Sequence, residues 1–235
     1  MWATWSTIWS TVSSDIQVVR HSRARSLRLS LDPVTGRARL VLPPRAALRP
    51  ALAWAQGKAG WLAEQRARLP QARPFVHGAL LPVADEPLTV DWRPGERRTV
   101  LRVGDALSVE GPPETAPRRV ERWLRRAVLD LLSRETAAVA ERAGVTVTQV
   151  AVGDPRRRWG SCAATGVIRY SWRLILAPGF VRRATVAHEV AHRVHMNHGP
   201  AFHALTAALL GDDPASARDW LRRHGAGLHW YGRAG

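Results

Sequence analysis

The sequence predicts an α+β fold, in which strands and helices occupy separate stretches of the chain. Period-two alternation of apolar and polar residues, which is typical of strands, recurs through the first 110 residues. From residue 118 onward, long stretches place their apolar residues at helical spacing. One of these helical stretches carries the motif His-Glu-x-x-His at residues 188–192, which places two potential metal ligands one turn apart.

The chain is expected to begin with a short extension and a hairpin. Residues 1–15 contain neither the basic start nor the apolar stretch of a secretory signal, and we treat them as a loose extension. After them, two alternating runs flank a turn at 32–36, and the second run ends at Leu42. This pattern predicts a β-hairpin at the start of a β-rich unit that spans 16–110.

One helix is predicted within this β-rich unit, over residues 49–69. Trp54 and Trp61 are seven residues apart, so a continuous helix would place both on one face, and we expect that face to be buried. Three further strands are predicted after the helix, at 88–92, 99–103 and 107–109.

The segment 111–117 is the predicted domain boundary, because a glycine and three prolines separate a strand pattern from a helical one. The second domain is expected to span 118–235 and to open with a long amphipathic helix that Gly144 terminates. The elements predicted after it are strands at 145–152 and 167–172, a turn at 158–162, the helix of the His-Glu-x-x-His motif, and helices at 200–210 and 214–224.

The motif of His188, Glu189 and His192 predicts a zinc site. Residues four apart on a helix project from the same face, so both imidazoles can bind one Zn²⁺ with Glu189 beside it. A separate apolar stripe attaches the helix to the core; it comprises Ala187, Val190, Ala191 and Val194. The residue counts give about 0.01 chance matches to the motif in a chain of this composition, so coincidence is a poor explanation.

A third ligand is needed, and His198 is the preferred candidate. It stands just before a Gly-Pro pair that ends the helix and lets the chain turn back. His195 would lie about 10.5 Å along a straight helix from His188, too far to share the ion. No Glu follows Glu189, which excludes a glutamate ligand from a downstream helix. The alternatives that stay open are His203, Asp212, Asp213 and Asp219.

The amino-acid composition indicates which partners and which cellular compartment to expect. The formal net charge of +16 favours an anionic partner such as nucleic acid or nucleotides, although Lys58 is the only lysine and the excess of Arg is typical of compositional bias. The arginines that would form such a surface are Arg118, Arg122, Arg125 and Arg126, with Arg156, Arg157 and Arg158. No apolar run is long enough to cross a membrane, and the single Cys162 is compatible with a reducing cytoplasm, where we expect the protein.

Three motifs in a fixed order resemble the YgjP-like zinc metallopeptidase family, which is related to the SprT-like and WLM proteases. They are Arg158-Trp159-Gly160-Ser161-Cys162, His188-Glu189-Val190-Ala191-His192 and His198-Gly199-Pro200-Ala201-Phe202. The resemblance implies a zincin-like metalloprotease domain with zinc on His188, His192 and His198 and Glu189 as the catalytic residue. His203 departs from the family, which more often has Trp after the Phe, and this leaves a role for His203 at the metal open.

The expected activity is hydrolysis of peptide bonds by a zinc-activated water, with Glu189 as general base. Residues of the 158–162 segment are candidates for substrate contact, or for a tight turn with a buried Trp159. The donors that could stabilise the oxyanion are Arg158, His203, His224, His229 and Tyr231, and the acceptors that could orient the ligands are Asp154, Asp212 and Asp213.

Two alternative functions would use the same zinc site. One is a phosphohydrolase acting on nucleotides, which the abundance of arginine motivates. The other is a protease acting on nucleic-acid-bound proteins, or a nucleic-acid-associated protein with a structural zinc. A purely structural zinc site normally fills four positions with Cys and His, and the presence of a single Cys favours an open, catalytic site.

Overall fold

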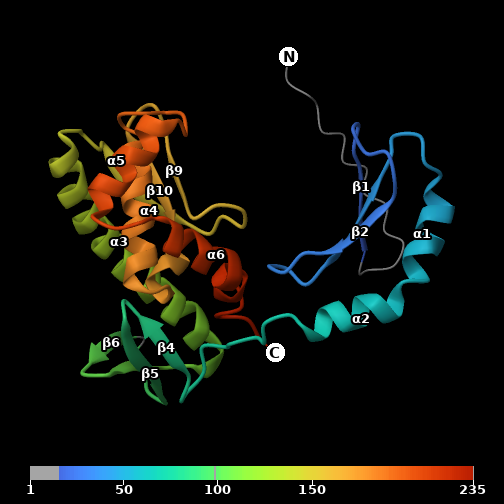
Figure 1. Cartoon of the computed structure of the whole chain (residues 1–235). Helices are drawn as coiled ribbons and strands as arrows, with labels where there is room; N and C mark the ends of the chain where they lie inside the picture. Colours follow the sequence, from blue (N-terminus) through green and yellow to red (C-terminus); the bar gives the residue numbers. More distant parts are fainter. Residues whose placement is uncertain (1–15, 98, 235) are drawn as a thin grey trace. The chain divides into compact units, whose positions relative to one another are not determined.

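The computed structural model describes residues 16–97 and 99–234 and has the mixed α+β composition that the sequence predicts (Figure 1). The chain divides into two compact units between Gln71 and Ala72. The extension expected at 1–15 lies outside the described residues.

Unit 1 contains a three-stranded sheet and two short helices. The strands are β1 (Ile16–Arg20), β2 (Arg28–Leu31) and β3 (Ala38–Leu42), and the helices are α1 (Leu48–Gln56) and α2 (Ala59–Ala67). Strands β2 and β3 form the antiparallel hairpin that the turn predicts, while β1 adds to β3 in parallel. Alternate residues of β3 face α1, and the small core comprises Ala51, Leu52, Ala55, Leu40 and Leu42.

The helix predicted over 49–69 is interrupted at Gly57 and Lys58. The buried residues of α1 are Ala51, Leu52 and Ala55, and Leu62 is the buried residue of α2, so neither Trp54 nor Trp61 lies on a buried face. Their exposed fractions are 39% and 40%, and the expectation that they are buried was therefore wrong.

Unit 2 begins with a four-stranded sheet of β4 (Leu80–Val83), β5 (Glu86–Arg93), β6 (Val100–Val103) and β7 (Ala106–Glu110), in the order β4-β5-β7-β6. Its inward residues, which include Leu88, Val90 and Leu107, belong to the same hydrophobic cluster as the helices that follow. The predicted boundary at 111–117 is thus not where the structure divides. Turn residues mark a local change of chain direction, but they do not reveal which elements share a core.

The remaining elements of unit 2 are α3 (Ala116–Ala143), β8 (Gln149–Gly153), β9 (Gly160–Cys162), β10 (Val167–Ser171), α4 (Gly179–Ala191), α5 (Pro200–Leu210) and α6 (Ala215–Leu228). Two 3₁₀ turns, Pro113–Thr115 and Trp172–Leu176, precede α3 and α4. Gly144 ends α3 with a left-handed φ of 63°, as predicted. The strand expected at 145–152 forms only from Gln149, and the last helix continues to Leu228.

Helix α4 lies at the centre of unit 2, with α3, α5, α6 and β9 packed around it (Figure 1). Most of its side chains are buried, including Val181, Val186 and Val190. The second sheet has the order β8-β10-β9, so β9 forms its edge next to α4. The helix that carries the His-Glu-x-x-His motif is therefore held on several sides.

The two ends of unit 2 are joined. Arg73 and Tyr231 form a parallel bridge, in which the Arg73 N–H donates to the Trp230 carbonyl at 2.9 Å and the Gly232 N–H donates to the Arg73 carbonyl at 2.8 Å. Arg173 holds the same segment from inside the unit, donating to the carbonyl of Leu228 at 2.8 Å. Within the described part of the chain, no helix combines the length and the apolar character needed to cross a bilayer.

Candidate metal centre

The first two histidines lie at the C-terminal end of α4. His188 is in the last turn, and His192 is the residue that caps the helix, its N–H bonding to the carbonyl of His188 at 3.3 Å. Their ring centroids are 4.9 Å apart, as four-residue helical spacing predicts.

His198 joins this pair from the turn between α4 and α5. The candidate ligand atoms of His188, His192 and His198 all lie within 4.8 Å of one another, and this is the only such group of metal-binding side chains within the described residues. The Nε2 atoms of His188 and His198 are 3.3 Å apart. Three imidazole nitrogens this close fit the ligand set of a catalytic zinc ion.

Phe202 on α5 packs against all three imidazoles. Its ring centroid lies 4.9, 4.5 and 4.7 Å from those of His188, His192 and His198. The Gly-Pro pair positions it, because Gly199 is extended and Pro200 starts α5. The buried Phe202 therefore restricts the orientation of all three rings.

A backbone carbonyl orients His192. Its Nδ1 lies 3.0 Å from the carbonyl oxygen of His195, which favours a proton on Nδ1 and leaves Nε2 free for a metal. His195 contributes this carbonyl, and its imidazole does not join the cluster. The sequence predicts aspartates for this orienting role and does not reveal the His195 carbonyl, because every residue carries a backbone carbonyl.

The local environment of His188 and His192 favours their neutral form, which is the form that binds metal. Burial and then the nearby charges of His192, His198, His203 and Arg218 lower the pKa of His188 to about 4. Burial also lowers the pKa of His192, although its bond to the His195 carbonyl opposes the shift. The three-imidazole donor set and the lowered pKa values of His188 and His192 thus both suit a divalent cation such as Zn²⁺.

Glu189 is buried beside the histidines, with an exposed fraction of 5%. Its backbone belongs to α4, but its carboxyl group forms no hydrogen bond or ion pair with any residue in the described ranges. Burial raises its pKa to about 7, and the charge of Arg158 opposes this shift. A carboxyl group with a pKa near neutrality can both accept and release a proton at physiological pH.

Gly160 makes room for the Glu189 carboxyl group. A Cβ atom at Gly160 would lie 2.6 Å from Cγ and 2.7 Å from Cδ of Glu189, closer than van der Waals contact allows. The segment 158–162 thus brings a backbone position against the candidate base. This close approach explains the glycine at that position, whereas the conformational role expected from the sequence does not, because Gly160 has no positive φ.

Trp159 attaches the segment 158–162 to α6, on the side of the segment away from Glu189. Its indole ring lies against Gly225 of α6, where a Cβ would come within 2.8 Å, and its centroid is 5.5 Å from that of His229. His229 is itself buried next to Asp154. Ser161 pairs with Arg169 in the β9–β10 ladder, and Arg158 is exposed.

Other candidates from the sequence lie apart from the three imidazoles. His203 is exposed, with its ring centroid 6.4 Å from that of His198. His224 packs on Trp220, and the hydroxyl of Tyr231 accepts a hydrogen bond from Arg73. Asp154 binds Arg173 in a bidentate pair at 2.7 and 3.0 Å, so it does not orient a ligand.

The aspartates proposed as alternative ligands have other partners. Asp213 accepts a hydrogen bond from the N–H of Ala215 at 2.9 Å, Asp212 accepts one from the N–H of Asp213 at 2.7 Å, and Asp219 pairs with Arg222 at 3.2 Å. None of them belongs to the group of candidate ligands. Cys162 lies half-buried in β9, where burial raises the pKa of its thiol, which disfavours a nucleophilic thiolate.

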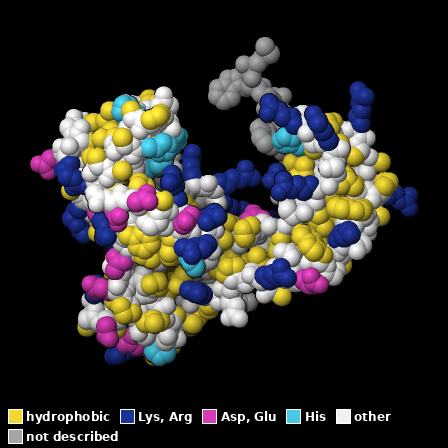
Figure 2. Space-filling view, in the orientation of Figure 1, with side chains coloured by type: hydrophobic (Ala, Val, Ile, Leu, Met, Phe, Trp, Pro, Cys, Tyr) yellow, Lys and Arg dark blue, Asp and Glu magenta, His cyan; other side chains and the backbone are white. Residues whose placement is uncertain are grey.

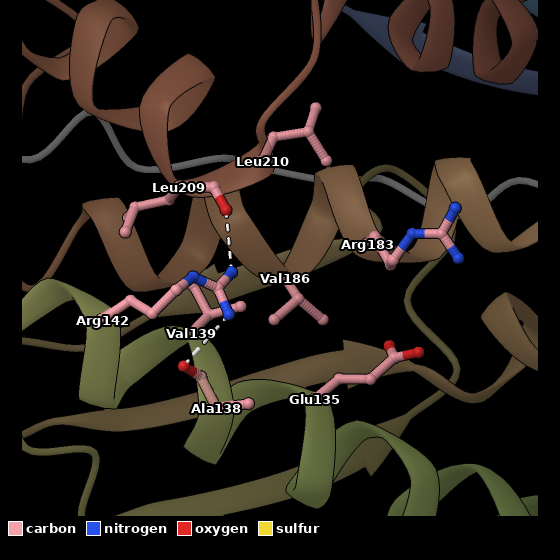
Figure 3. Close-up of a pocket in the computed structure, with 8 residues that line it drawn as sticks. All are labelled: Glu135, Ala138, Val139, Arg142, Arg183, Val186, Leu209 and Leu210. Atoms are coloured by element: carbon pink, nitrogen blue, oxygen red, sulfur yellow. Dashed lines mark hydrogen bonds between the residues drawn. The ribbon is translucent and has the colours of Figure 1, made fainter.

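A cavity of about 190 Å³ lies on another side of α4, between α3 and α5 (Figure 3). Val186 and Leu209 line it, and Arg142 crosses from α3 to donate to the carbonyl of Leu209 at 2.8 Å. None of the three clustered histidines or Glu189 lines this cavity. It is therefore separate from the candidate metal centre.

Comparison with known proteins gives one match. The YgjP-like family, described as a metallopeptidase domain, matches residues 25–224. No curated protein and no solved structure matches the chain.

Proposed function

Because the chain belongs to the YgjP-like metallopeptidase family, we propose that it is a zinc-dependent peptidase with a zincin-like catalytic domain. His188, His192 and His198 hold the metal in this proposal, and Glu189 is the general base. The observation that carries it is the convergence of three imidazoles beside a buried carboxyl group that makes no hydrogen bond to the described residues.

The ligand set favours a catalytic over a structural metal. Structural zinc sites are usually closed by four Cys and His ligands, whereas three histidines meet here and Cys162 lies outside the group. A zinc ion bound in such a site supplies Lewis acidity, which lowers the pKa of water and polarises a carbonyl group.

Glu189 carries the proton in the proposed reaction. Its carboxylate takes a proton from the water that attacks the peptide carbonyl and delivers it to the nitrogen of the leaving amine. Gly160 and the buried surroundings keep the carboxyl group in one place and limit its contact with bulk water. Burial raises the pKa of this group, which makes its carboxylate a stronger base for the first transfer.

The substitution Glu189→Gln tests this role. It removes the base and keeps the size of the side chain, so kcat on casein should fall by about 1,000-fold while the zinc content, measured by atomic emission, stays near one ion per chain. An active Glu189→Gln variant would show that another group carries the proton. Turnover of nucleoside triphosphates without turnover of casein would favour the phosphohydrolase alternative instead.

A matched pair of variants tests the third ligand. His198→Ala should lose bound zinc, because it removes one of the three clustered imidazoles. His203→Ala changes the same residue type on a neighbouring exposed position and should retain zinc. Loss of zinc from His203→Ala alone would reverse the assignment.

A further inference from the structure

The three-stranded sheet of unit 1 has one face that points away from α1. Alternate residues of β3, from Ala38 to Leu42, form the small core with α1, so Arg39 and Val41 point to the opposite face. Arg28 of β2 pairs with Val41 and therefore lies on that face as well. The strand register gives the residues of this outer face, which are Gln17, Val19, Arg28, Ser30, Arg39 and Val41.

Two arginines of the outer face are neighbours, and three more flank them. Arg28 and Arg39 occupy diagonal positions across the antiparallel β2–β3 pair, and residues in such positions are roughly 7–8 Å apart. Arg23 and Arg25 lie in the loop that leads into β2, and Arg37 immediately precedes β3. All of them are exposed except Arg39, which is half-buried. We call these five arginines the basic face.

The positive charges of unit 1 are balanced by few carboxylates. Residues 1–71 contain 11 Lys and Arg against 3 Asp and Glu, whereas residues 72–235 contain 24 against 16. The density of basic residues is thus similar in the two units, as a compositional bias toward Arg predicts, and the density of acidic residues differs. Figure 2 shows many magenta side chains among the dark blue ones on unit 2 and few on the visible side of unit 1. A bias toward Arg does not explain this shortage of carboxylates.

The carboxylates in the described part of unit 1 leave the basic face unpaired. Asp32 accepts a hydrogen bond from the N–H of Val34 at 2.8 Å, within the turn between β2 and β3, and Glu64 is on α2. None of the five arginines forms an ion pair with a residue in the described ranges. On α3, by contrast, Arg125 binds Glu121 at 2.7 Å. The charge of the basic face is therefore available to an anionic partner.

We propose that the basic face binds the phosphate backbone of duplex DNA. Protein partners and membranes usually require aromatic or large apolar anchors, which the six residues of the outer face do not include. Single-stranded nucleic acids stack their bases on aromatic rings, which the outer face also lacks. Cationic side chains alone are sufficient to bind a phosphate backbone.

The dimensions of the sheet favour DNA over duplex RNA. Three adjacent strands span roughly 10 Å, which is comparable with the major groove of B-DNA, about 12 Å wide. The major groove of duplex RNA is deep and narrow, so its two edges do not present phosphates to a flat surface in the same way. The inference is independent of the proposed peptidase function, because the three clustered histidines belong to unit 2.

The salt dependence of binding tests the inference. A fluorescein-labelled duplex of about 20 base pairs is titrated with the full chain, and the association constant is measured by anisotropy at several NaCl concentrations. If each of the five arginines neutralises one phosphate, the logarithm of this constant should fall with log[NaCl] with a slope of about −4 to −5. Affinity that does not depend on salt would overturn the inference, as would the absence of binding at about 50 mM NaCl. Tighter binding of duplex RNA of the same sequence, or binding of phosphatidylserine vesicles without binding of DNA, would overturn the choice of DNA.

Variants locate the binding surface. The double variant Arg28→Gln/Arg39→Gln should bind DNA about 10- to 100-fold more weakly and reduce the slope by about 2. The double variant Arg122→Gln/Arg126→Gln removes the same charge from exposed positions of α3 and should change the affinity by less than about 2-fold. An equal loss in both would indicate an effect of net charge and overturn the inference, and a loss only in the second would assign DNA binding to α3.

A second pair of arginines guards against misfolding of the sheet variant. Arg23→Gln/Arg25→Gln changes only the loop before β2, so the three strands and their core are untouched. It should also reduce the slope by about 2. An unchanged slope and affinity in this variant, with a loss in Arg28→Gln/Arg39→Gln only when its circular dichroism shows unfolding, would overturn the inference.

Discussion

The two ends of α4 each bring a carboxylate against a glycine, with different outcomes. At the N-terminal end, Asp85 from the β4–β5 turn accepts a hydrogen bond from the Gly179 N–H at 2.6 Å and lies 3.5 Å from Arg182. At the C-terminal end, Glu189 lies against Gly160 with no hydrogen-bonding partner among the described residues. The first carboxylate stabilises the positive end of the helix dipole, whereas the second has a raised pKa.

Close packing against a glycine alone does not determine whether a carboxylate has its charge stabilised by partners or has a raised pKa. Both glycines exclude a side chain because a carboxylate occupies the space. The partners differ: hydrogen bonds and a cation stabilise the charge of Asp85, whereas burial destabilises the charge of Glu189. Perturbed ionisation of this kind is typical of functional sites.

The largest predicted effect is on activity, at the Gly160 end. In Gly160→Ala the added Cβ would displace the Glu189 carboxyl group, and a displacement of this size should lower kcat by about 100-fold. The zinc content should change little, since the histidines are untouched, while the overlap lowers the free energy of unfolding by about 1–3 kcal/mol. Gly60→Ala is the matched control, because nothing lies within 4 Å of the added Cβ. Full activity of Gly160→Ala would show that Glu189 is not held by this contact.

The next effect is on stability, at the Gly179 end. In Gly179→Ala the new Cβ would overlap with the Asp85 carboxylate and approach Arg183 Nη1 to 2.9 Å. Repositioning Asp85 should lower the free energy of unfolding by about 1–3 kcal/mol in urea titrations. The folded protein should keep its kcat, because His188 and Glu189 lie at the other end of α4. A large loss of kcat in Gly179→Ala without a loss of stability would contradict the prediction that the two ends of α4 have different roles.

The smallest predicted effect is a pH-dependent change in stability at His229. This residue contacts Trp159, the neighbour of Gly160. Burial and then the charge of Arg173 lower the pKa of His229 to about 4, against about 6.5 in an unfolded chain. The unfolded state therefore binds more protons between these values, and stability falls as the pH decreases from 6.5 to 4. Solvent relaxation reduces the expected loss to about 1–2 kcal/mol.

His229→Phe isolates this contribution. Metal-free wild-type protein should lose about 1–2 kcal/mol more than His229→Phe between pH 7.5 and pH 4.5, measured by urea unfolding. The comparison cancels the titration of the clustered histidines and Glu189, which both proteins share. Identical losses would mean that His229 takes up a proton without cost in the folded state.

The sequence predicts features that depend on local spacing. Gly144 ends α3, the His-Glu-x-x-His motif lies at the end of a helix, and the Gly-Pro pair after His198 starts α5. These features involve residues within a few positions of one another, where helix geometry determines which side chains meet. The proximity of His198 to His188 was inferred from the same reasoning and is observed.

Features that depend on long-range packing could not be predicted. Gly160 and Glu189 are far apart in the chain, and neither type of residue indicates the other. The cap on α4 comes from Asp85, which lies 94 positions before Gly179. The break between α1 and α2 at Gly57 and Lys58 is likewise not revealed by helical periodicity. Such contacts follow from the arrangement of elements in three dimensions, which spacing along the chain does not specify.

The bridge between Arg73 and Tyr231 imposes an order of assembly during translation. The strand-like segment at Arg73 leaves the ribosome early, but its pairing partner at 230–232 is synthesised much later. Arg173 likewise cannot donate its hydrogen bond to the Leu228 carbonyl until Leu228 has been synthesised. The three histidines and Glu189 therefore emerge before the contacts that secure Trp159 and the end of α6. The contacts of Arg73 and Arg173 with residues 228–232 therefore form only after those residues have been synthesised.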